Sequence, residues 1–294
     1  METAVSNARL TSTVRDLVSL TKPRITLMVL ITTAGGMWLA PPGGLSWSLV
    51  AVMLLATGAV VGSANALNCW LERDVDRHMT RTARRPLPAG RLDPRLALGF
   101  GLALGVVSVP VLAFAVNPLT GLLGAAALVS YVAVYTPLKQ RSPAALLVGA
   151  VPGALPPLMG WTAATGNIEA PAVVLFGILF LWQLPHFLAI ALFRKDEYAN
   201  AGLRVLPAVR GDRVAKWHLV LYAGALVPVS LMLVPMGVAG SVYLTVAAVA
   251  GAAFLGASVV GLRRAAGLRW ARGVFVVSLV YLTALFAALL VDAG

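Results

Sequence analysis

The sequence predicts an all-α integral membrane protein made of one bundle of nine transmembrane helices. Its 294 residues are 59% hydrophobic and only 12% charged, about half the charged fraction of a typical soluble domain. The mean hydropathy of +0.87 agrees with this class. Long apolar stretches recur along the chain, and the basic residues gather in every second connection between them.

Apolar stretches of about 17 to 25 residues are long enough for a helix to cross the hydrocarbon core of a bilayer. We expect nine such spans, at residues 25–40, 48–67, 96–116, 119–135, 144–164, 171–193, 219–236, 242–262 and 274–291. Glycine, alanine and proline are frequent within them, and closely packed membrane helices tolerate all three.

The basic residues set the predicted orientation. With the N-terminus inside, all 23 lysines and arginines fall in inner segments. Cytoplasmic loops carry an excess of Lys and Arg, so we expect a cytoplasmic N-terminus and a C-terminus outside. The protein would then be a multi-pass protein of the cell (plasma) membrane.

The polar segments fix where chemistry can occur. We expect a cytoplasmic tail at residues 1–24 and a single membrane domain at 25–294, with inner polar caps at about 68–95 and 194–217. The outer connections are short and poor in charge, which places the active site on the cytoplasmic side. The net charge of +12 is explained by topology, so we expect the lipid bilayer and no nucleic acid as a partner. The single cysteine excludes an intramolecular disulfide framework.

The first inner cap concentrates side chains that can hold a metal ion. Asn68, Glu72 and Asp76 are spaced four and four, so on a helix they share one face. Mg²⁺ prefers carboxylates and is usually bound together with substrate phosphates. The stripe spans about 12 Å, which fits a metal–diphosphate assembly. Asp74 lies off this face and is expected to pair with Arg73, Arg77 or a neighbouring helix. The alternative is a solvated helix end laced with ion pairs.

Basic side chains lie close to this stripe in the sequence and on a second inner connection. Arg81, Arg84 and Arg85 form a turn stiffened by prolines, and Lys139 and Arg141 follow the fourth span. Arginine forks match diphosphate oxygens. Ordinary positive charge on inside loops is the competing interpretation.

The sixth span carries polar side chains at membrane depth. Trp182, Gln183 and His186 lie within it, and Asp196 lies just past its inner end. Buried polar groups in a membrane are costly without partners, which favours a substrate cavity. A histidine satisfied by one neighbouring hydrogen bond is the simpler alternative.

Several motifs together resemble a known family. Asn68-x-x-x-Glu72-x-x-x-Asp76, followed by Arg81-Thr82-x-x-Arg85-Pro86-Leu87, resembles the first metal–diphosphate motif of UbiA-type intramembrane prenyltransferases. A wider set is similar to the protohaem IX farnesyltransferase (haem O synthase) branch: Thr21-Lys22-Pro23-Arg24, Tyr135-Thr136-Pro137-Leu138-Lys139, Gly153-Ala154-x-Pro156-Pro157, Pro185-His186-Phe187 and Lys195-Asp196-Glu197-Tyr198.

The resemblance implies a nine-helix bundle that uses Mg²⁺ to transfer farnesyl from farnesyl diphosphate to a vinyl group of haem B. The product, haem O, would pass to haem A synthase as a further partner. The roles implied by position are metal binding by Asn68, Glu72, Asp76 and Asp196, diphosphate binding by Arg81, Arg85, Lys139 and Arg141, and acceptor contact by Trp182, Gln183 and His186.

Two other functions remain open at this stage. A sister prenyltransferase that acts on a quinone precursor would share the first motif. A multi-span transporter would explain the intramembrane histidine and prolines, although it would not require the acidic stripe. The chain also departs from the superfamily pattern, because Glu72 stands where many members have Asp and the second acidic motif is reduced to the segment around Asp196.

Overall fold

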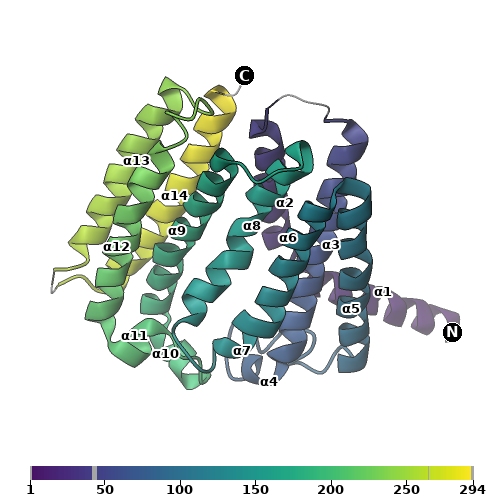
Figure 1. Ribbon diagram of the computed structural model, residues 1–294. Coiled ribbons are helices and arrows are strands. Elements are labelled where there is room, and N and C mark those ends of the chain that lie inside the picture. The colour runs from purple at the N-terminus through teal and green to yellow at the C-terminus, as the bar shows by residue number, and fades with distance from the viewer. Residues whose placement is uncertain (1, 42–44, 264, 293–294) are drawn as a thin grey trace.

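The computed structural model describes residues 2–41, 45–263 and 265–292, and side chains from Thr11 onward. Every regular element in these ranges is a helix, which confirms the all-α class. Figure 1 shows long helices running side by side, with short helices gathered at one end of the bundle. These are α4 (Arg73–Asp76), α7 (Thr136–Leu138), α10 (Lys195–Asn200) and α11 (Leu206–Arg210).

The long helices follow the predicted spans in order. They are α2 (Pro23–Leu39), α3 (Trp47–Leu71), α5 (Pro94–Val111), α6 (Pro118–Val129), α8 (Ala145–Thr165), α9 (Ala170–Phe193), α12 (Asp212–Leu231), α13 (Ser241–Val260) and α14 (Leu268–Asp292). Within the described ranges, eight helices are long and apolar enough to cross a membrane, or up to nine if one bent pair counts as a single span. The multi-pass class is confirmed, and the count of nine stays a prediction.

One predicted span is displaced. The seventh helix, α12, begins at Asp212 rather than Leu219 and ends at Leu231 rather than Met236. A search for apolar residues misses the polar first turns, which an aspartate near the helix N-terminus stabilises. The helix therefore extends beyond the apolar stretch at its inner end.

Two spans end in π-helical turns near prolines. Helix α5 continues into η1 (Leu112–Val116), just after Pro110, and α6 continues into η2 (Ser130–Tyr135), just before Pro137. Proline lacks a backbone N–H, and a wider turn lets the helix continue past the missing hydrogen bond. Through η2 the chain delivers Thr136, whose side chain is buried, to the end of the bundle that carries the short helices.

The segment expected as a tail is helical. It forms α1 (Glu2–Leu20), and the part of this helix from Thr11 to Leu20 meets α2 at an angle of 49°. Lys22 turns the chain there with φ 50°, and Pro23 starts α2. Figure 1 shows α1 projecting sideways from the end of the bundle that carries α4. The C-terminal Ala293 and Gly294 lie outside the described residues, and the sidedness of both termini stays a prediction.

Helices α2 and α8 cross with almost no space between their backbones. A Cβ added at Gly160 would collide with the Thr33 carbonyl oxygen, and one added at Gly36 would collide with the Pro157 carbonyl oxygen. Small residues permit such close approach between membrane helices. The glycines of the proline-rich span therefore serve helix packing.

Gly160→Ala is expected to destabilise the protein by about 1–3 kcal/mol, because the added methyl group must push α2 and α8 apart. Thermal unfolding in detergent micelles would measure this. Gly273→Ala in α14 is the control, because its Cβ would meet nothing within 4 Å. Equal melting temperatures for the two variants would contradict the close crossing.

Candidate active site at the inner end of the bundle

The helical spacing of the acidic stripe (Asn68, Glu72 and Asp76) is kept although the helix that carries it is interrupted. Helix α3 ends at Leu71 and α4 begins after Glu72, so the predicted continuous helix through Asp76 is interrupted. The backbone N–H of Glu72 still donates to the Asn68 carbonyl at 2.9 Å, and that of Asp76 to the Glu72 carbonyl at 2.8 Å. The three residues are only 2%, 6% and 1% exposed in chain order.

Glu72 lies at the centre of a polar cluster built from three segments. Its Oε1 is 2.5 Å from Lys139 Nζ, and its Oε2 accepts a hydrogen bond of 2.9 Å from the Asn68 amide. The same amide nitrogen lies 3.2 Å from Thr136 Oγ1. Lys22 Nζ donates to Asn68 Oδ1 at 3.2 Å. Sequence motifs contain Lys22 and Thr136, but only the fold places them in the cluster.

The two lysines of this cluster, Lys22 and Lys139, differ in the direction of their pKa shifts and in the charge of their partners. Burial lowers the pKa of Lys22, whose hydrogen-bond partner is a neutral amide. Burial also acts to lower the pKa of Lys139, but Tyr135 and Glu72 outweigh it and the net shift is upward. Lys139 therefore stays charged with a carboxylate beside it. Lys22 is the cation that would gain more from an incoming anion.

Asp76 forms the second half of the site. Its Oδ2 accepts a 2.7 Å hydrogen bond from Arg85 Nη1, and its carbonyl accepts one of 2.8 Å from Thr82 Oγ1. Asp74 is exposed and pairs with Arg77 at 3.6 Å and, more loosely, with Arg73 at 3.9 Å. The prediction that Asp74 pairs with neighbouring arginines is confirmed.

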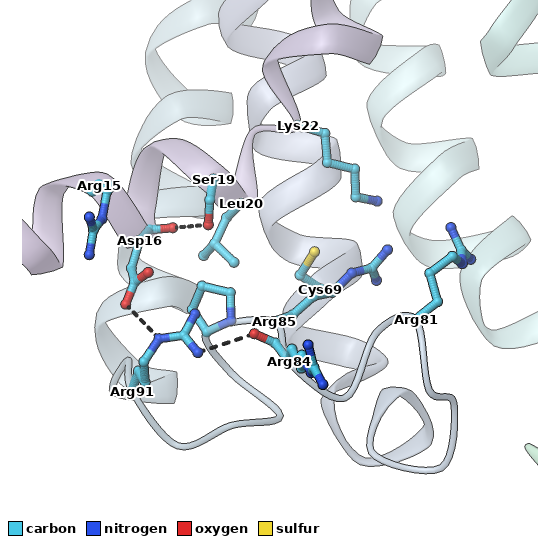
Figure 2. Close-up of a pocket in the computed structure, with 11 residues that line it drawn as sticks. Arg15, Asp16, Ser19, Leu20, Lys22, Cys69, Arg81, Arg84, Arg85 and Arg91 are labelled. Atoms are coloured by element: carbon cyan, nitrogen blue, oxygen red, sulfur yellow. Dashed lines mark hydrogen bonds and ion pairs between the residues drawn. The ribbon is translucent and has the colours of Figure 1, made fainter.

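A cationic pocket of about 420 Å³ opens beside the stripe. In Figure 2, Lys22, Cys69 and Arg85 point into the same space, and Arg81 borders it on one side. The remaining lining residues are Arg15, Asp16, Ser19, Leu20, Arg84, Pro86 and Arg91. Basic side chains far outnumber acidic ones here, which suits an anionic ligand such as a diphosphate.

The second inner cap packs against the first, because Leu203 packs with Met79. It also contacts the connection after the fourth span, where the backbone N–H of Arg204 donates to the Lys139 carbonyl at 2.9 Å. The described contacts do not join Asp196 or Arg141 to the stripe, and both side chains are exposed. Their assigned roles stay predictions.

The polar residues of α9 are held by neighbouring helices. His186 Nδ1 lies 2.8 Å from Ser278 Oγ, and its ring packs against Trp182 at 4.7 Å and Phe275 at 4.8 Å. Gln183 donates to the Ala150 carbonyl of α8 at 3.4 Å and to the Leu179 carbonyl of its own helix at 3.0 Å. These contacts satisfy His186 within the bundle, and its contact with an acceptor stays a prediction.

The donor set fits a metal ion shared with a ligand better than a closed metal cage. Two carboxylates and one amide oxygen are the hard donors that Mg²⁺ prefers. Within the described part of the chain, no three Asp, Glu, His or Cys side chains gather as a complete metal site. Substrate phosphates would have to supply the remaining oxygens, as is usual for Mg²⁺.

Fold and site together define a class: a multi-pass membrane protein with a buried acidic stripe and a cationic pocket at one end of its bundle. The profile of the UbiA prenyltransferase family matches residues 29–290. The chain is 56% identical to "Protoheme IX farnesyltransferase" of Anaeromyxobacter sp. (strain Fw109-5), with 95% of this chain and 94% of the relative covered. It is 54% identical to that of Myxococcus xanthus, with 94% of each covered.

Solved structures support the fold. Digeranylgeranylglyceryl phosphate synthase aligns with a TM-score of 0.83 at 16% identity, covering 96% of this chain and 99% of that one. A UbiA homologue from Archaeoglobus fulgidus, bound to GPP and Mg²⁺, aligns at 0.67 and 18% identity, covering 93% and 99%. The chain belongs to the UbiA prenyltransferase family, among relatives named protoheme IX farnesyltransferase. It is a prenyltransferase, and the predicted resemblance is confirmed.

Lys139→Met is expected to lower the free energy of unfolding by about 3 kcal/mol, because it leaves the Glu72 carboxylate buried without its cation. Chemical unfolding in detergent would measure the loss. The double variant Lys139→Met/Glu72→Gln removes the stranded charge and should recover most of the stability. No recovery would show that Lys139 stabilises the fold by some means other than Glu72.

Proposed function

We propose that this enzyme transfers the farnesyl group of farnesyl diphosphate to a vinyl carbon of haem B, giving haem O and diphosphate with Mg²⁺ as cofactor. The observation that carries this proposal is the pair of buried carboxylates, each held by one basic side chain beside a cationic pocket. The names of the relatives support haem as the acceptor. The Archaeoglobus neighbour, bound to GPP and Mg²⁺, supports the metal.

The ion pairs suggest how the site receives its substrate. With Mg²⁺ bound, Glu72 and Asp76 would give their oxygens to the metal, and the metal would neutralise charge on the diphosphate. Their former partners, Lys139 and Arg85, would then turn to the diphosphate oxygens. This exchange leaves neither carboxylate nor cation unpaired, so binding avoids the cost of a stranded buried charge.

The remaining side chains stabilise the leaving group and shield the reacting carbon. Arg81 and Lys22 border the pocket and would add positive charge as the bond from farnesyl to diphosphate breaks. The apolar helices behind the stripe would keep water from the allylic cation until the vinyl group attacks. Water would then supply the hydroxyl group of the product, and its proton would leave to solvent.

The cellular setting follows from the charge pattern. We infer nine spans in the cell membrane, with α2 forming the first, and an active site facing the cytoplasm because every basic residue falls on that side. Haem A synthase, as the consumer of haem O, is the proposed downstream partner.

Asp76→Ala is expected to reduce product formation by at least about a hundredfold, because one of the two carboxylates that would hold the metal at the leaving group is lost. Purified enzyme in lipid nanodiscs, supplied with farnesyl diphosphate, haem B and Mg²⁺, would be assayed by chromatography of extracted haems. Asp74→Ala is the matched control and should retain activity, because Asp74 is exposed and pairs only with Arg73 and Arg77, outside the stripe. Full activity of Asp76→Ala would contradict the proposal.

The acceptor is tested separately. Wild-type enzyme given farnesyl diphosphate should consume haem B and release diphosphate only when Mg²⁺ is present. A quinone precursor offered in place of haem should give no prenylated product. Prenylation of the quinone precursor with haem unchanged would favour the sister activity, and no diphosphate release with either acceptor would favour a transporter.

A further inference from the structure

The side-chain amide of Asn68, the first residue of the acidic stripe, forms hydrogen bonds with three partners. Its nitrogen donates to Glu72 Oε2 at 2.9 Å and to Thr136 Oγ1 at 3.2 Å. Its oxygen accepts from Lys22 Nζ at 3.2 Å. A primary amide has two N–H donors, so both donors of Asn68 are used and its oxygen is left to face a cation.

The Thr136 hydroxyl group acts as an acceptor toward Asn68. Its own hydrogen points elsewhere, because Thr136 Oγ1 donates to the Tyr131 carbonyl at 2.8 Å. A hydroxyl group has one donor hydrogen and two lone pairs, so a lone pair remains for the Asn68 amide. Thr136 is only 2% exposed, and bulk water therefore does not compete for either hydrogen bond.

The π-helical turn η2 fixes the Thr136 hydroxyl group in this orientation. The Tyr131 carbonyl also accepts the backbone N–H of Thr136, which closes the last wide turn of η2. Pro137 follows and has no backbone N–H of its own. The hydroxyl group is therefore anchored to the backbone of its own segment, and its position does not depend on the charged side chains of the site.

The reverse orientation of the Asn68 amide would be unfavourable at every contact. Its NH2 group would face the Lys22 ammonium group, which is itself a donor. Its oxygen would face the Glu72 carboxylate and the Thr136 oxygen, whose hydrogen is already donated to Tyr131. Buried polar groups without partners are costly, so the three contacts together select the observed orientation.

The three partners of Asn68 would respond differently to substrate. In the proposed exchange of partners, Glu72 would give its oxygens to the metal ion, and the Lys22 charge would be drawn to the diphosphate. Two of the three contacts that orient the amide would then weaken. Thr136 is neutral and anchored to Tyr131, so its hydrogen bond to the amide would persist.

We propose that Thr136 is a positioning residue: by accepting a hydrogen bond from the Asn68 amide, it keeps the amide oxygen directed at the metal ion that the stripe would share with a prenyl diphosphate. This inference rests on the proposed function, because it requires a metal ion at the stripe. It gives Thr136 no contact with the substrate. Loss of a residue that orients a metal ligand in this way typically lowers metal affinity by about 10- to 100-fold.

Metal affinity measured without catalysis tests the proposal. Mn²⁺, a paramagnetic substitute for Mg²⁺, would be titrated into the detergent-purified full chain with farnesyl thiodiphosphate, a slowly ionising substrate analogue. Electron paramagnetic resonance would measure the free Mn²⁺. Thr136→Val keeps the side-chain shape but removes the acceptor, so the affinity should fall by about 10- to 100-fold. Thr136→Ser keeps the hydroxyl group and should bind Mn²⁺ nearly as tightly as the wild type.

Further variants separate orientation of the amide from packing. Thr120→Val removes another buried hydroxyl group, which meets Thr162 Oγ1 at 2.9 Å near the start of α6, and should leave the affinity unchanged. Asn68→Asp replaces the amide by a carboxylate with two equivalent oxygens, so in this background Thr136→Val should have little further effect. Thr136→Ala removes the same acceptor and takes the place of Thr136→Val if the valine variant does not fold.

The outcomes distinguish this proposal from the proposed function. Mn²⁺ binding by the wild type with unchanged affinity in Thr136→Val would overturn the role of Thr136 and leave the proposed function in place. Equal losses in Thr136→Ser or Thr120→Val, or a full loss in the Asn68→Asp background, would also overturn it, because packing would then set the affinity. A wild type that binds no Mn²⁺ with the analogue would contradict both.

Discussion

Two carboxylates buried at a membrane edge impose the main constraint on this structure. A buried charge without a partner costs several kcal/mol, so Glu72 and Asp76 each require a cation within contact distance. Lys139 and Arg85 meet this need from two separate connections. The short helix α7 (Thr136–Leu138) directly precedes Lys139 and brings it to the end of α3.

The same pairing explains how a stable resting site can also be a reactive one. Glu72 and Asp76 each have one strong basic partner. A metal diphosphate would offer the two carboxylates a metal cation and the two basic side chains a diphosphate anion. In the proposed function, substrate binding would be an exchange of partners. Lys22 differs, because burial lowers the pKa of its ammonium group and its hydrogen-bond partner is only the neutral Asn68 amide.

Much of the site could be predicted from the sequence because its spacing is local. Asn68, Glu72 and Asp76 follow helical periodicity, and the backbone hydrogen bonds between them persist where α3 gives way to α4. The roles of Lys22 and Thr136 could not be derived in this way. Their contacts with Asn68 join three distant segments, and they depend on the turn before α2 and on the π-helical turn that ends at Tyr135.

The sequence alone determined the membrane class, the order of the helices and the stripe, since each depends on hydropathy or spacing within one segment. It misjudged the start of α12, because helix formation includes the polar residues that precede the apolar stretch. Only the tertiary structure decided which cation neutralises each carboxylate, how α1 leans on the bundle and how closely α2 crosses α8. Those features depend on side-chain packing between segments that are remote in the chain, which no local pattern encodes.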